Sequence, residues 1–199
     1  MQVAETNIQF SVLVPRKETK RVVLHHSASQ IGTTWQDIHR WHLNNGWAGI
    51  GYHYCIHADG SIYRGRPEQM KGAHAYHDNQ REANSDGIGI CLVGNFETGA
   101  PTEAQLVSTV ELIRDIRTRY PGIPVIGHKD VMPTACPGRN FPWVELRKRL
   151  EGPQVAEPWK EKIIADAMQA GLITERHNPD EPAAKWFVLA VCLNLLKRR

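Results

Sequence analysis

The sequence lacks a strong charge imbalance and a long apolar run. Its 24 Lys and Arg residues face 21 Asp and Glu residues, which leaves a net charge of +3 over 199 residues. A basic excess of this size does not indicate a nucleic-acid partner. The most apolar stretch, residues 186–196, is interrupted by Asn194 and is only about half as long as the roughly 20 residues of a membrane-spanning helix. We therefore expect neither nucleic-acid binding nor membrane insertion.

Signals for export and for disulfides are also missing. The N-terminal segment has no basic leader followed by an apolar core and a small-residue cleavage site, so we expect cytoplasmic synthesis without a signal peptide. The four cysteines, at positions 55, 91, 136 and 192, form no CxxC pair. In a reducing compartment such scattered cysteines are free thiols rather than a disulfide framework. Of the four, Cys136 is the one that sits among other potential metal ligands.

Hydrophobic periodicity predicts an α/β fold. The Thr-Thr pair before residue 35 can cap a helix with Ile38 and Trp41 on its inner face, and Thr102 and Gln105 have the spacing of a capping box. The alternation of elements predicts a mixed central β-sheet flanked by helices. In chain order, the expected elements are a strand at 21–26, a helix at 35–45, a hairpin at 51–66, a buried strand at 86–96, a helix opening at 101–105 and a short strand at 124–128.

A change of composition after residue 150 predicts a second, smaller unit. Residues 1–150 form the expected main domain, and residues 151–158, with two prolines, a glycine and no periodicity, form a linker. Residues 159–199 are expected to form a helical hairpin, with helices at about 159–170 and 183–196. Two short helices bury little apolar surface alone, so this hairpin must pack on the main domain, on a second copy in a homodimer, or on a ligand.

Three residues far apart in the sequence have the chemistry of a metal site. His25 ends the first expected strand, His128 ends the last one, and Cys136 lies in the loop beyond, where Pro137 favours an extended, rigid backbone. Two imidazoles and one thiolate suit Zn²⁺, and a fourth coordination position left to water makes the site hydrolytic. For each residue taken alone a structural role is the favoured interpretation, so the argument for a metal site depends on their joint occurrence.

The sequence segments around these residues resemble those of a known protein family. The segments are VVLHHSAS, GWAGIGYHYCIHADGSIYRGRP, GAHA, GIGICLVGNF, PTEAQL and GHKDVMPTACPG. Over residues 21–150 they resemble, in this order, the type 2 N-acetylmuramoyl-L-alanine amidases, a zinc family that includes phage amidase lysins and the peptidoglycan recognition proteins. The resemblance implies zinc at His25, His128 and Cys136, and thus a zinc amidase catalytic domain in residues 1–150. It also implies catalytic roles for Tyr52 and Thr134.

The resemblance further implies a reaction and a substrate. The expected reaction is hydrolysis of the amide between N-acetylmuramic acid and L-alanine in peptidoglycan, with Thr134 helping to stabilise negative charge on the carbonyl oxygen. Tyr52 would orient water or substrate; it is also the first choice for the general base, and a neighbouring histidine is the second. The HExxH motif that supplies a glutamate base in many metalloproteases is absent from the sequence.

Three further residues are candidates for substrate contacts. His74 lies in the GAHA segment, which the family places beside the cleft. Trp47, between two glycines, suits the rim of a cleft and stacking on a sugar, and Asn95 could bind the peptide or simply form a turn after Gly94.

Three functions remain open at this point, of which the third, a regulatory protein that binds another enzyme, has no supporting feature in the sequence. The first is a phage or prophage endolysin that waits in the cytoplasm and then acts on the cell wall. The second is a noncatalytic peptidoglycan-binding module, against which Cys136 argues, because noncatalytic members of the family typically lack that ligand. The C-terminal segment resembles a single S-layer-homology repeat, which implies wall attachment; packing or dimerisation is the alternative.

Overall fold

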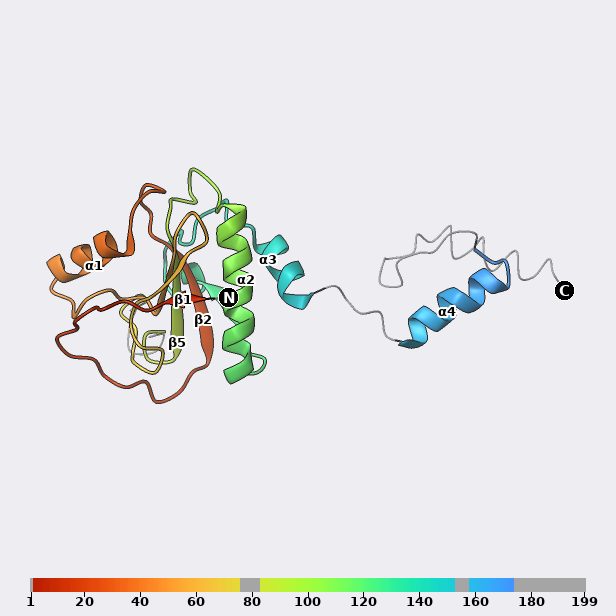
Figure 1. The fold of residues 1–199 in the computed structure, drawn as a ribbon, viewed down its shortest axis with the longest axis horizontal. Coiled ribbons are helices and arrows are strands. Elements are labelled where there is room, and N and C mark those ends of the chain that lie inside the picture. The colour runs from red at the N-terminus through yellow and green to blue at the C-terminus, as the bar shows by residue number, and fades with distance from the viewer. Residues whose placement is uncertain (1, 76–82, 153–157, 174–199) are drawn as a thin grey trace. The chain divides into compact units, whose positions relative to one another are not determined.

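The computed structural model describes residues 2–75, 83–152 and 158–173, and it divides into two compact units, Met1–Leu150 and Glu151–Arg199 (Figure 1). The elements in chain order are β1 (Val3–Ala4), β2 (Arg21–His26), α1 (Trp35–Asn44), β3 (Tyr54–Ile56), β4 (Ile62–Arg64), β5 (Gly87–Leu92), α2 (Glu103–Arg119), β6 (Val125–Gly127), the 3-10 helix η1 (His128–Asp130), α3 (Trp143–Glu151) and α4 (Pro158–Gln169).

One six-stranded sheet organises the first unit. Its strand order is β1-β4-β3-β5-β2-β6; β3 and β4 pair antiparallel as a hairpin, and the other neighbours are parallel. All six residues of β5 are buried, as expected for a nearly continuous apolar run in the middle of a sheet. The predicted α/β fold with a mixed central sheet is confirmed.

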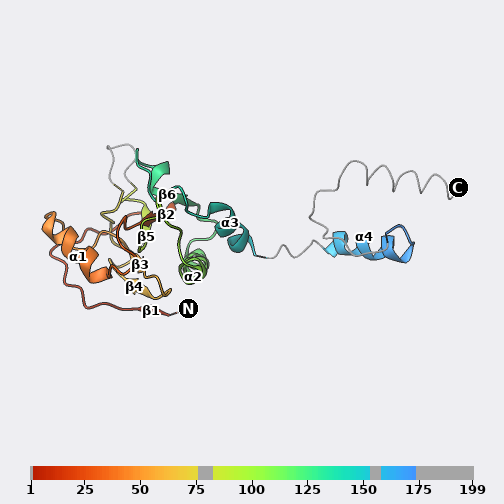
Figure 2. The ribbon, with the colours of Figure 1, turned by 90° about the horizontal axis from the view of Figure 1, so that it is seen from above.

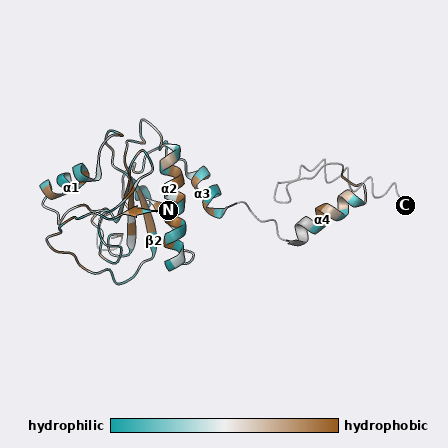
Figure 3. Ribbon diagram, in the orientation of Figure 1, coloured by the Kyte–Doolittle hydropathy of each residue, from teal (hydrophilic) through white to brown (hydrophobic). Residues whose placement is uncertain are grey.

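The two faces of the sheet are covered unequally. Figures 1 and 2 show α1 and α2 on opposite sides of the strands. The helix α2 begins with a capping box between Thr102 and Gln105 and packs a buried row of side chains on the sheet. Figure 3 shows that both α2 and the strands carry hydrophobic residues. The main core comprises Val22, Leu24, Tyr54, Ile56, Ile62, Ile88, Ile90, Leu92, Phe96, Leu106, Val110, Leu112, Ile113, Ile116, Ile123, Phe141 and Leu146.

The opposite face carries a smaller apolar cluster, which leaves room for functional side chains. Because residues alternate between faces along a strand, the residues next to the main-core positions, His25 of β2 and Cys91 of β5, point to this side. The cluster itself contains Ile38, Ile50, Cys55, Cys91 and Val93.

The helix α1 contacts this face less extensively than its sequence predicts. Thr34 caps the helix with a complete capping box to Asp37, as its position indicates. Ile38 is its one buried residue, and Trp35 is partly buried beside it. Trp41, expected on the inner face, is 40% exposed. The apolar contact with the sheet is made by the first half of the helix, whereas in the second half His42 lies against the chain before β3, its ring 5.5 Å from that of Tyr52.

Short elements differ most from expectation. The two-residue strand β1 and the helix α3 are not predicted from the sequence. His128 does not end a strand, because β6 stops at Gly127 and His128 opens η1. The expected helix at 159–170 is α4, whereas the expected helix at 183–196 lies outside the described residues. No helix in the described part of the chain has the length and apolar character needed to cross a bilayer.

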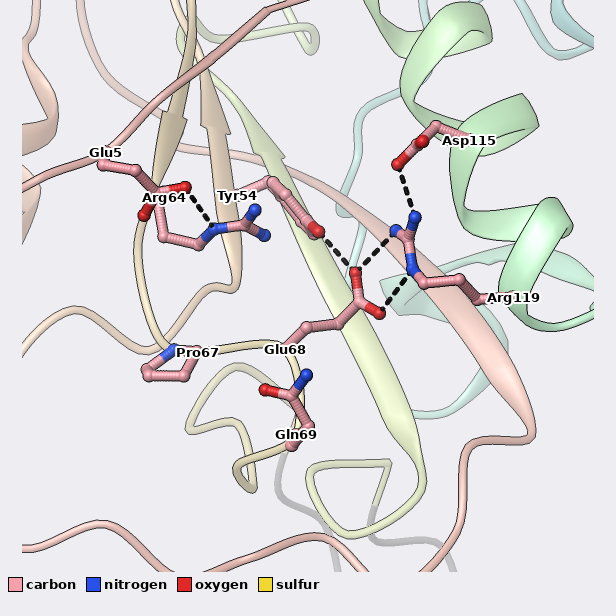
Figure 4. Close-up of a pocket in the computed structure, with 8 residues that line it drawn as sticks. All are labelled: Glu5, Tyr54, Arg64, Pro67, Glu68, Gln69, Asp115 and Arg119. Atoms are coloured by element: carbon pink, nitrogen blue, oxygen red, sulfur yellow. Dashed lines mark hydrogen bonds and ion pairs between the residues drawn. The ribbon is translucent and has the colours of Figure 1, made fainter.

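A polar network on the α2 side of the sheet ties the end of α2 to the strands. In Figure 4, Tyr54 of β3, Arg119 of α2 and Glu68 from the loop after β4 point toward one another. They line a pocket of about 300 Å³. The Glu68 carboxylate accepts hydrogen bonds from the Tyr54 hydroxyl and, at 2.9 and 3.1 Å, from the Arg119 guanidinium. Although burial raises the pKa of Glu68, these hydrogen bonds outweigh it and hold that pKa below its ordinary value. The network satisfies its own charges and stabilises the fold.

Candidate metal centre

The structure brings His25, His128 and Cys136 together, with one potential ligand atom of each lying within 4.8 Å of the others. The sheet topology explains the meeting of the two histidines. β2 and β6 are parallel neighbours whose last paired residues are Leu24 and Gly127, so the next residue of each chain segment emerges at the same edge. The ring centroids of His25 and His128 are 4.4 Å apart.

The loop after η1 places the thiol against this pair. The backbone N–H of His26 donates to Cys136 Sγ at 3.4 Å, and the N–H of Lys129 donates to the Cys136 carbonyl at 2.8 Å. Gly138 has a φ of +107°, a conformation that side-chain-bearing residues rarely adopt, and its chain lies against the backbone of Phe96. Cys136 Sγ consequently lies 3.8 Å from His25 Nδ1.

The donor set fits a zinc ion. Zn–N bonds of about 2.0–2.1 Å and Zn–S bonds of about 2.3 Å at tetrahedral angles place ligand atoms roughly 3.3–3.6 Å apart, close to the 3.8 Å between Sγ and Nδ1. Burial lowers the pKa of His25 well below its ordinary value and that of His128 to about 4, so both imidazoles are neutral and able to bind a metal at pH 7. Burial also raises the pKa of Cys136 to about 11, so a bound cation is what would make this sulfur a thiolate.

Two aromatic residues from the sequence prediction lie beside His25. Its ring centroid is 5.1 Å from that of Tyr52, and its Nε2 lies 3.0 Å from Nδ1 of His74. The rings of Tyr52 and His74 are nearly parallel, with centroids 6.3 Å apart. Burial raises the pKa of Tyr52, so its hydroxyl is protonated at neutral pH and can donate a hydrogen bond.

The remaining predicted residues fall in three places. Trp47 is 41% exposed and lines a pocket of about 430 Å³ together with His74 and His128. Thr134 lies in the ligand loop, where its hydroxyl accepts a hydrogen bond from the Cys136 N–H at 3.3 Å. The side-chain oxygen of Asn95 accepts the N–H of Glu97 at 3.0 Å, which is the turn-forming alternative.

The structure adds neighbours that sequence reasoning missed. Met132 Sδ lies 2.9 Å from Nε2 of His128, four residues earlier, and lines the same pocket. Asn84 accepts hydrogen bonds from the backbone N–H groups of His74 and Ala75 at 2.6 and 2.9 Å. His42 accepts the Gly51 N–H at 2.9 Å.

Known proteins resemble the part of the chain that carries this centre. The family profile described as N-acetylmuramoyl-L-alanine amidase matches residues 15–139. An endolysin of Klebsiella phage KP32 is 33% identical over 139 residues, which cover 65% of this chain and 85% of the endolysin. Peptidoglycan-recognition protein SC2 of Drosophila melanogaster is 37% identical over 136 residues, covering 63% and 71% of the two chains.

The fold is similar as well. The solved structure of the endolysin and N-acetylmuramoyl-L-alanine amidase LysCS from Clostridium intestinale URNW aligns with a TM-score of 0.70 at 36% identity. The alignment covers 75% of this chain and 95% of that one.

Proposed function

The chain belongs to the N-acetylmuramoyl-L-alanine amidase family, and on this basis we propose that it is a zinc-dependent amidase. Its proposed reaction is hydrolysis of the bond between N-acetylmuramic acid and the L-alanine of the peptidoglycan stem peptide. The similarity to phage endolysins supports peptidoglycan as the substrate and a phage or prophage endolysin as the biological role.

The observation that carries this proposal is the convergence of His25, His128 and Cys136 beside an open pocket. The three side chains would hold the metal through two neutral nitrogens and one sulfur and leave a position free for water or substrate. Zinc bound there supplies a Lewis acid for the carbonyl and lowers the pKa of a bound water to about 7.

The other residues of the site position the substrate and stabilise charge. The protonated Tyr52 hydroxyl can donate a hydrogen bond to the scissile carbonyl or to the attacking water. Thr134, in the ligand loop, would stabilise negative charge on the carbonyl oxygen through its hydroxyl. Trp47 and Met132 form apolar walls of the pocket, where Trp47 would stack on a sugar ring and both would exclude water.

Digestion of purified cell walls tests this function. The zinc-loaded protein should release free stem peptides with a new L-alanine N-terminus and leave the glycan strands uncut, which mass spectrometry resolves. The Cys136→Ser variant should release none. Lys129→Ala changes an exposed residue one position after His128 and should cleave as the wild type does. Wall binding without peptide release by the zinc-loaded protein would instead establish a noncatalytic binding module.

A further inference from the structure

His74 makes a direct side-chain contact with a proposed zinc ligand. Its Nδ1 lies 3.0 Å from Nε2 of His25, and the two residues are 8% and 1% exposed. Water therefore has little access to compete for this hydrogen bond. A ring in this position can act on the metal centre through His25 as well as on a substrate.

The protonation pattern of the two rings follows from the geometry. Nδ1 of His25 is the nitrogen that faces Cys136 Sγ, at 3.8 Å, so it is the atom that would bind the metal and must carry no proton. A neutral imidazole has one N–H, which then lies on Nε2 and points at His74. His74 must accept this hydrogen bond through an unprotonated Nδ1 and carry its own proton on Nε2.

The His74 ring is held in place by close contacts with the neighbouring backbone. A Cβ atom at Gly89 of β5 would lie 2.6 Å from its Cγ and 2.7 Å from its Nε2, and one at Gly72 would lie 2.6 Å from the same Nε2. Both glycines thus allow the ring to lie directly on the backbone. Asn84 binds the N–H groups of His74 and the following residue, which fixes the main chain.

We propose that His74 is a positioning residue for the metal centre: it accepts the Nε2–H of His25 and thereby holds the His25 ring with Nδ1 directed at zinc. This role differs from a substrate contact, because it acts on metal affinity when no substrate is present. It rests on the proposed zinc function. Outer hydrogen-bond partners of metal-binding histidines typically change metal affinity or activity by about 10- to 100-fold when they are removed.

Two substitutions at the same position separate the hydrogen bond from packing. His74→Asn places an amide oxygen near the position of Nδ1 and keeps an acceptor, whereas His74→Leu keeps a similar volume and has none. Zinc affinity is measured without substrate, by competition with a chromophoric chelator. We expect His74→Leu to bind zinc about 10- to 100-fold more weakly. His74→Asn should stay within about threefold of the wild type, because it preserves the acceptor.

Equal zinc affinity of the wild type and His74→Leu would overturn the inference. An equal loss of zinc affinity in His74→Leu and His74→Asn would also overturn it, because the effect would then come from packing and not from the hydrogen bond. Imidazole ¹⁵N spectra of the zinc-loaded wild type give a second test that needs no folded variant. They should show the His25 proton on Nε2, and a proton absent from this atom would also overturn the inference. If the wild type binds no zinc at all, both the proposed zinc function and the positioning role of His74 fail. If the wild type binds zinc and the His74 variants bind it with the same affinity, only the positioning role of His74 is refuted.

Discussion

A methyl group added at Gly89 should disturb the metal centre from the far side of the His74 ring. The residue lies inside β5 with ordinary strand geometry, so alanine fits its backbone, and replacing a strand glycine normally stabilises by roughly 0.5–1 kcal/mol. Here the new Cβ would lie 2.6–2.7 Å from two atoms of His74. Ordinary contacts between nonbonded carbons are about 3.5–4.0 Å, so the ring has to move by about 1 Å.

The clash should outweigh the gain in backbone stability. Overpacking a buried site costs roughly 1–3 kcal/mol, so Gly89→Ala should lower the free energy of unfolding of the metal-free protein by about 1–2 kcal/mol in urea titrations. Gly99→Ala is the matched control, because its Cβ would meet its nearest atom at 3.7 Å. A change within about 0.5 kcal/mol is expected there.

A double-mutant cycle identifies the ring as the source of the strain. In a His74→Ala background the space occupied by the imidazole is open, so Gly89→Ala should become neutral or stabilising. Displacement of the ring by about 1 Å also breaks the 3.0 Å hydrogen bond to His25, so zinc affinity should fall in Gly89→Ala and not in Gly99→Ala. An equal loss of stability in both backgrounds, with a coupling energy below about 0.5 kcal/mol, would refute the reasoning.

Three other perturbations have defined outcomes. Cys136→Ser should abolish amidase activity and weaken zinc binding while far-UV circular dichroism stays unchanged; full activity would remove Cys136 from the ligand set. Glu68→Gln should cost about 1.5–3 kcal/mol of stability, because it breaks a buried charged hydrogen-bond network, whereas exposed Glu103→Gln should cost less than about 1 kcal/mol. Because the pKa of Glu68 is lowered by folding, its ionised carboxylate stabilises the fold fully above the unfolded-state pKa of about 4.3. This stabilisation is lost as the pH falls through the folded-state pKa. In urea titrations at lower pH, the difference in unfolding free energy between wild type and Glu68→Gln should therefore become smaller. Deletion from residue 157 onward should leave cleavage of small soluble muropeptides intact and reduce binding to whole walls, measured by co-sedimentation; aggregation of the truncated protein would instead indicate a packing role for the C-terminal unit.

Local signals in the sequence were sufficient for the longer elements. A strand that is apolar at every position can be stable only inside a sheet, and β5 is buried throughout. The helix starts at Thr34 and Thr102 could be predicted from the sequence, because capping depends on residues within one turn of each other. The two-residue strand β1 and the exposure of Trp41 could not be predicted from the sequence, because each depends on which distant segment of the chain packs against that residue or strand.

The sequence by itself determined the residue types of the candidate metal centre: two imidazoles and one thiol, taken together, are a donor set that suits zinc. Only the tertiary structure decided which ring nitrogen of His25 faces Cys136 and which residue contacts the other ring nitrogen. These facts depend on the parallel register of β2, β5 and β6, which brings residues more than 100 positions apart to one edge, and on Gly89, whose missing side chain makes room for His74. Register and close approach are pairwise properties of distant segments, so no local pattern contains them.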